Sequence, residues 1–283
     1  MSLAGRRTAP FDDYPAAGYA WPLRAFPAAE AAAASEQFMA HWKGNIGRYS
    51  DSLPRERIWL TIDTHLALPW VCNLALHPAV LDAVERVLGP DVLVWNTHWF
   101  PKFPGDRTYV SWHQDAAYWG LRPPLVTTAW IALTPSTCAS GCLQVLPGSH
   151  LGELMPQNET FAPDNMLSRG QEIAVEIDPA RTISLELEPG EFSLHHIGLA
   201  HGSGPNTSAT PRIGLAVRYI APQVKQTGAS RDMVVLARGQ DNYGHFDLVT
   251  PPTREWGLDE NSLQRQSLQR KLDNNATRGS TAT

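Results

Sequence analysis

The sequence predicts a mainly β domain, either a sandwich, a jelly roll or a barrel, with helices at its N-terminal end. From residue 91 onward the chain forms many short segments rich in Val, Ile, Thr and aromatic residues, separated by Pro and Gly. Short strands divided by turn residues are typical of all-β folds. Two segments before residue 91 have helical composition or spacing, and we find no internal repeat and no interdomain linker. These observations predict one β domain covered by helices.

The N-terminal third predicts two helices. Residues 28–43 are strong helix formers, and we expect this helix to begin after Pro27 and to end at Gly44. Residues 78–88 begin with Pro78, place apolar residues at helical spacing and stop before Gly89. Both segments therefore carry start and stop signals of the kind that bound helices.

Seven later segments are predicted strands: 91–103, 108–113, 126–133, 143–146, 183–187, 191–197 and 212–220. Residues 152–172 predict a long loop between strands, of a length that often serves as a lid or binding loop. A helix is expected over 260–272, followed by a disordered polar tail over 274–283. We expect a single domain over 1–258, with its core at roughly 91–221, and a C-terminal helix and tail over 259–283.

Composition excludes several classes of function. The net charge is −5, and no cluster of Lys and Arg is present, so nucleic acid is not an expected partner. The longest apolar stretch is far shorter than the about 20 residues that a membrane helix needs. Three cysteines do not form a disulfide framework, and residues 1–13 lack the apolar core of a signal peptide. We therefore expect a cytoplasmic protein without a membrane or nucleic-acid partner, either a monomer or a homodimer.

The first candidate for chemistry is the pair His113 and Asp115. On a strand, residues i and i+2 project from the same face, so both side chains can point at one atom. An imidazole beside a carboxylate suits a divalent transition metal, and a second histidine would complete a facial triad with open positions. The pair alone is not specific, because His-x-Asp also occurs by chance.

Two further signals follow in the chain. His201 precedes Gly202-Ser203 and can supply the second imidazole, although His195 and His196 compete for this place. Those two are adjacent, so only one of them can face a barrel interior. Arg212 lies eleven residues after His201 and can hold a carboxylate through two parallel hydrogen bonds. Arg218 has the same strand parity and is a secondary candidate.

Taken together, these motifs resemble the phytanoyl-CoA dioxygenase family of Fe(II)- and 2-oxoglutarate-dependent oxygenases. The stretches that carry the resemblance span roughly residues 91–221. They are Trp112-His113-Gln114-Asp115 with Tyr118-Trp119, Gly141-Cys142-Leu143 leading to Pro147-Gly148-Ser149-His150, and His201-Gly202-Ser203 leading to Arg212 and Arg218-Tyr219.

The resemblance implies a double-stranded β-helix, a jelly-roll or cupin-like core, with flanking N-terminal helices. It places His113, Asp115 and His201 at the catalytic metal-ligand positions. It places Arg212 at the position that pairs with 2-oxoglutarate, and Ser203, Trp130 and Lys102 near the co-substrate. The implied cofactors are Fe(II), 2-oxoglutarate and O2. The implied reaction hydroxylates a C–H bond while 2-oxoglutarate becomes succinate and CO2, and Asp115 favours hydroxylation over halogenation.

The substrate pocket is predicted less directly, and a small or medium polar metabolite is the expected substrate. Candidate substrate contacts lie near the ligand strand and in the predicted loop: Trp99, Tyr118, Trp119, Arg169 and Gln171. An ion pair at the surface is the alternative for the arginine among them. Fold and cofactor do not select a substrate.

Other functions remain open at this stage. The same scaffold can catalyse desaturation, cyclisation or epoxidation of a natural product. A metal-binding β-barrel without activity, or hydrolysis at a zinc ion held by the same ligands, would also fit the donor set. A Ser-His-Asp hydrolase is less consistent, because no Gly-x-Ser-x-Gly elbow is present.

Overall fold

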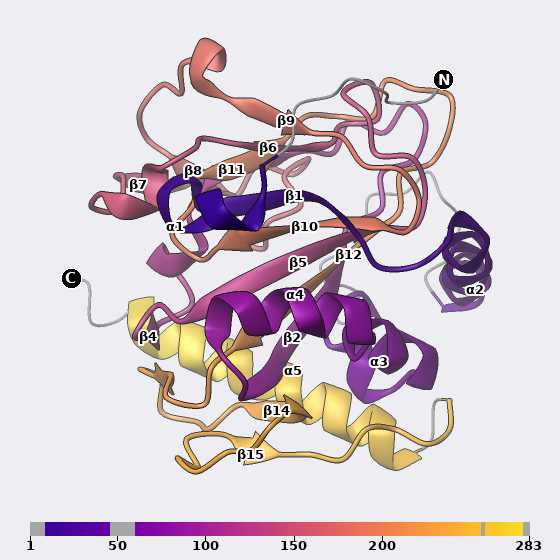
Figure 1. Cartoon of the computed structure of the whole chain (residues 1–283), viewed down its shortest axis with the longest axis vertical. Coiled ribbons are helices and arrows are strands. Elements are labelled where there is room, and N and C mark those ends of the chain that lie inside the picture. Colours follow the sequence, from indigo (N-terminus) through magenta and orange to yellow (C-terminus); the bar gives the residue numbers. More distant parts are fainter. Residues whose placement is uncertain (1–8, 46–59, 256–257, 280–283) are drawn as a thin grey trace.

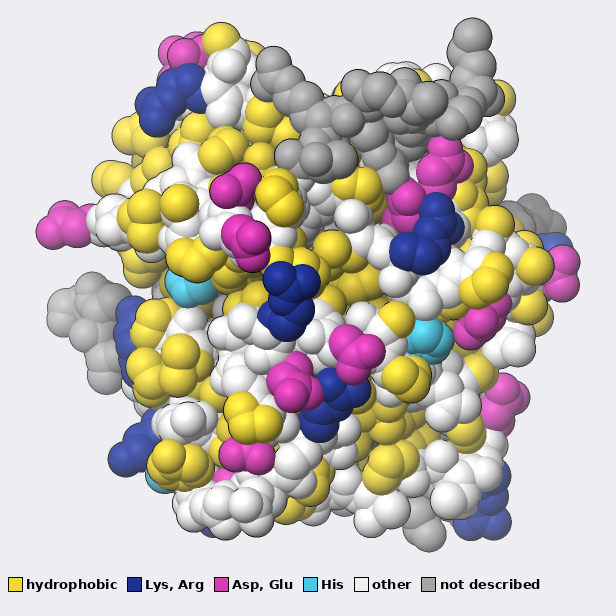
Figure 2. Space-filling view, in the orientation of Figure 1, with side chains coloured by type: hydrophobic (Ala, Val, Ile, Leu, Met, Phe, Trp, Pro, Cys, Tyr) yellow, Lys and Arg dark blue, Asp and Glu magenta, His cyan; other side chains and the backbone are white. Residues whose placement is uncertain are grey.

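The computed structural model describes residues 9–45, 60–255 and 258–279. Two antiparallel sheets form its centre, and helices cover one of them (Figure 1). This arrangement confirms the predicted mainly β, jelly-roll architecture with N-terminal helices. Acidic and basic side chains are interspersed on the face drawn in Figure 2. No helix of the described residues is long and apolar enough to cross a membrane.

The large sheet has seven strands. In spatial order they are β1 (Tyr19–Arg24), β10 (Glu191–His196), β5 (Val126–Ala132), β12 (Gly214–Ile220), β2 (Val92–Trp99), β14 (Met233–Arg238) and β15 (Asp247–Leu248). All neighbours pair antiparallel except β14 and β15. The predicted strands 91–103, 126–133, 191–197 and 212–220 are thereby confirmed, each with slightly shorter bounds.

The small sheet has four strands, in the order β3 (Val110–His113), β11 (His201–Ser203), β6 (Leu143–Val145) and β9 (Ile183–Leu185). Two further ladders pair β4 (Leu121–Arg122) with β13 (Lys225–Gln226) and β7 (Gln157–Glu159) with β8 (Gln171–Ile173). The segment 152–172, predicted as a loop, therefore contains β7 and the first two residues of β8. Its polar composition concealed the short ladder, because β7 is mostly exposed and β8 is only partly buried.

The helices are α1 (Tyr14–Ala17), α2 (Ala28–Asn45), α3 (Pro69–Ala75), α4 (Pro78–Leu88) and α5 (Leu258–Gly279). As predicted, α4 begins at Pro78 and ends before Gly89, whose φ of 91° suits glycine. The predicted end of α2 at Gly44 is wrong, because the helix continues through that residue. An exposed glycine costs a helix only about 1 kcal/mol, which does not force termination.

The chain ends differ from prediction. The N-terminal third is not only helical, because β1 pairs with β10 at the edge of the large sheet. The predicted disordered tail is wrong for 274–279, where α5 continues. Asn274 is fully buried, and its side chain bonds to Ser230 and Asp232. Residues 280–283 of that tail lie outside the described residues, as do residues 1–8 of the segment examined for a signal peptide.

The two faces of the large sheet have different partners. Along β5, Ala129 and Ile131 belong to the apolar core that α3 and α4 cover. Trp130 and Ala132 alternate with them and pack with residues of the small sheet. The space between the two sheets, on the Trp130 face, is therefore where side chains of both sheets can meet.

Candidate metal centre

Two paired strands bring the predicted histidines together. His113 ends β3, and His201 begins β11 directly opposite it in the antiparallel register. Directly paired residues project from the same face of a sheet, so the rings meet with centroids 4.1 Å apart. His195 faces the same space, 4.6 Å from His201, whereas His196 projects away, as expected for adjacent strand residues.

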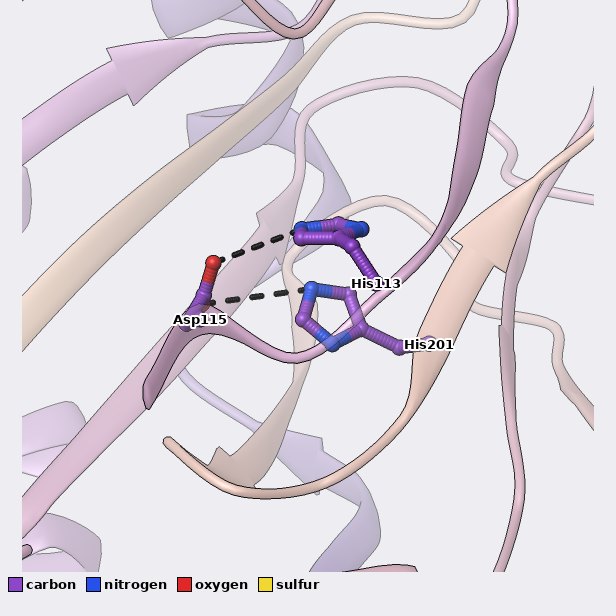
Figure 3. A group of neighbouring side chains, drawn as sticks. All are labelled: His113, Asp115 and His201. Carbon is purple, nitrogen blue, oxygen red and sulfur yellow. Dashed lines mark ion pairs between the residues drawn. The ribbon is translucent and has the colours of Figure 1, made fainter. Parts of the chain in front are cut away.

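Asp115 reaches the same point by a different route from the one predicted. It does not continue the strand of His113, but begins a 3₁₀ turn over Asp115–Ala117. The intervening Gln114 keeps an extended backbone, and its side-chain amide donates to the Gly198 carbonyl at 2.7 Å. The carboxylate therefore still turns toward both imidazoles (Figure 3).

The three ligand atoms surround one small volume. His113 Nε2 lies 3.3 Å from Asp115 Oδ1, and His201 Nε2 lies 3.9 Å from Asp115 Oδ2. All three ligand atoms lie within 4.8 Å of one another. Ligands about 2.0–2.2 Å from a common ion are separated by about 3–4.4 Å, so the spacing fits a single metal.

Hydrogen bonds orient both imidazoles for coordination. His113 Nδ1 donates to the Ser111 carbonyl at 2.9 Å, and His201 Nδ1 donates to the Leu199 carbonyl at 2.8 Å. A carbonyl can only accept, so each Nδ1 carries the proton. Each Nε2 is then left with its lone pair toward Asp115, which is the arrangement that metal-binding histidines require.

Burial sets the charge states of the ligands. Burial is the main cause that lowers the pKa of His201 to about 4, so this imidazole is neutral near pH 7. Burial alone would raise the pKa of Asp115, but its contact with His113 and nearby charges, Arg218 among them, lower it to about 2. Two imidazoles and one ionised carboxylate form the donor set of non-haem Fe(II) sites, so the residues present fit ferrous iron.

The triad opens into a cavity between the sheets. About 440 Å³ of space around the triad is not filled by atoms, part of it open to solvent. Arg212, Ser203 and Trp130 line it together with the three metal ligands. The structure therefore brings three of the four residues predicted near the co-substrate into the same space as the triad.

Arg212, for which the sequence predicts a co-substrate role, lies in the wall of this cavity. It is 1% exposed, and its guanidinium carbon lies 5.0 Å from the centre of the Trp130 ring. Its Nη atoms donate to the carbonyls of Gly141 and Phe100. Its Nε has no hydrogen-bond partner among the described residues. A buried guanidinium bonded only to neutral carbonyls fits the far carboxylate of 2-oxoglutarate.

Lys102 lies behind the cavity wall. It pairs with Arg212 through backbone hydrogen bonds, and its Nζ donates to Ser203 Oγ at 2.6 Å. Burial, followed by the charge of Arg212, lowers the pKa of Lys102 to about 6. The structure therefore places Lys102 behind Ser203, one residue further from the cavity than predicted.

The predicted substrate contacts are not among the residues that line this cavity. Trp99 lies on the other face of the sheet, where its indole donates to Thr64 Oγ1 and packs on Phe38. The reason is its register: Trp99 pairs with Leu215, which faces the helices. The geometry therefore moves Trp99 from the predicted pocket into the core.

The other four predicted contacts lie outside the cavity wall. Arg169 Nη1 forms an ion pair with Glu159 Oε1 at 3.1 Å. The central carbon of its guanidinium lies 5.3 Å from the centre of the Tyr118 ring. Gln171 begins β8 and accepts a hydrogen bond from the backbone N–H of Arg169. Trp119 packs on Trp95. For the arginine, the surface ion pair considered as the alternative is the one observed.

Thr128 had no role predicted from the sequence, His195 was considered only as a competitor of His201 for the metal, and Arg218 was a secondary candidate for the co-substrate. All three line the cavity. Strand parity could have found Thr128, because it lies two residues before Trp130 on β5.

Comparison with known proteins places the chain in a family. Residues 14–214 match the model of the phytanoyl-CoA dioxygenase (PhyH) family. The chain belongs to this family. Membership agrees with the resemblance drawn from the sequence motifs, and the family's name designates dioxygenases, which are oxidoreductases. The PhyH fold here carries a complete His-Asp-His donor set.

Relatives match over part of their length. The peroxisomal phytanoyl-CoA dioxygenase of Homo sapiens is 32% identical over 146 residues, 50% of this chain and 43% of that protein. A probable α-ketoglutarate-dependent hypophosphite dioxygenase of Stutzerimonas stutzeri is 30% identical over 159 residues, 56% of this chain and 55% of that protein. The chain thus spans about half the length of the curated relatives it matches.

Solved structures match over most of the chain. The apo structure of the non-heme monooxygenase ThoJ is 32% identical, with a TM-score of 0.82 over 94% of this chain and 97% of that one. CytC3 with Fe(II) and α-ketoglutarate is 23% identical, with a TM-score of 0.63 over 88% of this chain and 96% of that one. These likenesses agree with the jelly-roll fold described above.

Proposed function

We propose that this PhyH-family protein is an Fe(II)- and 2-oxoglutarate-dependent dioxygenase that hydroxylates a C–H bond of a small or medium polar metabolite. One observation carries the proposal. Two imidazole Nε2 atoms and one carboxylate converge on a single point of a cavity that also contains the buried guanidinium of Arg212. The metal ligands and the carboxylate anchor are the two parts that such an enzyme needs together.

Each residue has a role that follows from its contacts. His113, Asp115 and His201 would hold the iron, and Arg212 and Ser203 would hold the far carboxylate of 2-oxoglutarate beside it. Iron, when bound with 2-oxoglutarate and O2, supplies the oxidation that converts C–H to C–OH and releases succinate and CO2. The two sheets bury the triad, whose members are each 4–6% exposed, and so keep bulk water from the reacting centre.

Several observations separate this proposal from its alternatives. The Asp115 carboxylate occupies the position that chloride would need in a halogenase, which favours hydroxylation. Zinc hydrolysis and a metal-binding barrel without activity share the donor set, but neither needs Arg212. Desaturation, cyclisation and epoxidation use the same scaffold, so the product decides among them.

The named relatives support the reaction class more than any one substrate. Their names refer to phytanoyl-CoA, hypophosphite and 1-deoxypentalenic acid. A polar metabolite remains our proposal, because polar and charged side chains make up much of the cavity lining. A cytoplasmic location also remains part of the proposal, supported by three cysteines that are all free.

A substrate screen that measures succinate formation tests the proposal. We expect succinate only when Fe(II), 2-oxoglutarate, O2 and an accepted substrate are all present, and a product 16 mass units heavier, one added oxygen atom. The Asp115→Ala variant should give none, while Arg238→Gln, at the surface far from the triad in sequence, should match the wild type. A chlorinated product from the wild-type enzyme would overturn the assignment of hydroxylation.

A further inference from the structure

A second set of polar side chains lines the cavity, and neither the metal nor the co-substrate accounts for it. It consists of His195, Thr128 and Arg218. These residues lie on β10, β5 and β12, three neighbouring strands in the middle of the large sheet. Thr128 pairs directly with His195 on one side and with Arg218 on the other. They therefore form one row across the sheet, on the face that Trp130 shares.

These three residues, which we call the polar row, are buried, and each has a polar atom without a hydrogen-bond partner among the described residues. His195 and Thr128 are each 2% exposed, and Arg218 is 8% exposed. His195 Nδ1, Thr128 Oγ1 and Arg218 Nε have no hydrogen-bond partner among the described residues. Leaving a buried polar atom unpaired costs about 1–3 kcal/mol. Three such atoms in one row of a cavity indicate that a polar ligand group completes them.

Arg218 has no carboxylate in direct contact, although Asp115 and Asp63 lie near enough to interact with its charge. Its Nη1 donates to the neutral amide of Asn96, and no carboxylate of the described residues lies within 4.0 Å of it. Asp63, the acid beyond Asn96, is already paired with Lys271. A buried charge without a counter-ion in direct contact is unfavourable, so the site favours an anion.

The shape around Arg218 selects how that anion approaches. Trp119 and Phe100 lie near the guanidinium, with ring centres at 5.1 Å and 5.9 Å from its central carbon. Asn96 Oδ1 accepts a hydrogen bond from Nη1 of the guanidinium. The remaining edge includes the unpartnered Nε, and a planar oxyanion can accept two parallel hydrogen bonds there.

The far carboxylate of 2-oxoglutarate, assigned above to Arg212, does not account for this second guanidinium. Arg212 and Arg218 are six residues apart on one extended segment, so their Cα atoms are separated by about 20 Å. With iron and 2-oxoglutarate in place, the ferrous ion and both guanidiniums would bring four positive charges. Asp115 and 2-oxoglutarate would bring three negative charges. At least one positive charge is left over, and protonation of Lys102 on co-substrate binding would add another, so a further anion would improve the balance.

We propose that the polar row is the subsite that anchors the substrate, and that the substrate carries a carboxylate or a similar compact monoanionic group. Arg218 forms an ion pair with this group, while Thr128 Oγ1 and His195 Nδ1 provide neutral hydrogen bonds. The assignment of this anion to the substrate rests on the proposed function. It narrows the polar metabolite proposed above to an acid.

Calorimetry on the protein loaded with Zn(II) and 2-oxoglutarate tests this without turnover. The probes are benzoate and benzamide, which have nearly the same shape but differ in charge. We expect benzoate to bind and benzamide to bind at least tenfold more weakly. Arg218→Gln should weaken benzoate about tenfold or more, and Thr128→Val should weaken it several-fold. Arg238→Gln removes a guanidinium from a surface ion pair and should change nothing.

Three results would overturn the proposal. The first is that benzoate and benzamide bind with equal affinity. The second is that Arg218→Gln leaves the affinity for benzoate unchanged. The third is that Arg218→Gln weakens 2-oxoglutarate binding as much as it weakens benzoate binding. The last result would assign Arg218 to the co-substrate. If Arg218→Gln does not fold, Arg218→Lys replaces it and should lose affinity because a bidentate edge becomes a single point charge.

The same titrations separate this proposal from the proposed function. If the wild-type protein fails to bind Zn(II) and 2-oxoglutarate, the dioxygenase assignment fails. Benzoate is then titrated into the metal-free protein with an Arg212→Gln background. An effect of Arg218→Gln in that background would still support the anion subsite, and no effect would overturn it.

Discussion

Gly214 offers a sharp test of how the co-substrate end of the cavity is built. A methyl group at this position would lie within 2.6 Å of three atoms of the Trp130 ring. The nearest of these atoms would be 2.0 Å away, whereas ordinary contact requires about 3.5–4.0 Å, so the ring would have to move by about 1.5 Å or more. Trp130 is 5% exposed and lies beneath the guanidinium of Arg212, so little free space is available. Gly214→Ala should therefore disturb both stability and the carboxylate anchor.

The expected size follows from overpacking. Forcing extra volume into a packed site costs about 1–3 kcal/mol, and we expect Gly214→Ala to lose that much in the free energy of unfolding. The displaced ring should also move Arg212, so the affinity for 2-oxoglutarate should fall about tenfold. Urea unfolding measures the first quantity, and calorimetric titration of 2-oxoglutarate into the Zn(II)-loaded protein measures the second.

Matched variants make this test specific. Gly44 lies exposed in α2, and an added methyl would meet nothing within 4 Å. Gly44→Ala should be neutral or stabilise the protein by up to about 1 kcal/mol. Trp130→Leu in the Gly214→Ala background should cost less than the sum of the two single changes, because the smaller side chain removes the clash. A Gly214→Ala protein with wild-type stability and wild-type 2-oxoglutarate affinity would refute the reasoning.

Four further predictions concern charged groups. Lys271→Met should lower the free energy of unfolding, measured with urea, by about 3–5 kcal/mol, because it leaves the buried Asp63 carboxylate without its cation. Adding Asp63→Asn to this variant should restore much of the loss. A loss below about 1 kcal/mol in Lys271→Met would contradict this prediction. Burial is the main cause that lowers the pKa of His65 to about 4, whereas the unfolded imidazole titrates near 6.5, so the unfolded state binds more protons between these values. The free energy of unfolding should therefore fall as the pH is lowered from about 6.5 to about 4. In His65→Gln this fall should be about 3 kcal/mol smaller. The same pH dependence in the variant and the wild type would exclude the effect. Arg212→Ala should weaken 2-oxoglutarate binding at least tenfold while leaving Zn(II) affinity unchanged, and unchanged co-substrate affinity would remove its assigned role. Binding of 2-oxoglutarate at pH 7.5 should also take up a proton, because a nearby anion raises the lowered pKa of Lys102; binding enthalpies that do not vary with the buffer's ionisation enthalpy would count against this.

Much of the architecture was predictable because local signals agree with the tertiary structure. The segments rich in β-branched residues became strands, and Pro78 and Gly89 mark the ends of α4. The strand β1 escaped prediction because Pro22 interrupts it and its pairing with β10 is set only by the folded sheet. Asn274 belongs to a polar segment whose composition favours disorder, but its contacts with the sheet keep it helical.

The candidate site also has a part that could be predicted from the sequence and a part that depends on the folded structure. The types and order of the three ligands indicated a metal, because few other arrangements need a carboxylate between two imidazoles. The sequence could not tell which face of each strand meets the cavity. From the sequence, Trp99 and Trp130 are equally good candidates for aromatic residues that line the cavity. Only the pairing register of β2 with β12 shows that Trp99 faces the helices. The polar row was missed for the same reason, since it exists only across strands.

The central claim is that the three side chains hold one ferrous ion to which 2-oxoglutarate binds directly. Absorption spectroscopy without oxygen tests this most directly. The wild-type protein should develop a weak visible charge-transfer band only when both Fe(II) and 2-oxoglutarate are added, and a variant carrying His113→Ala and His201→Ala should not. A wild-type protein that stays colourless with both additions, or a double variant that keeps the band, would contradict the account.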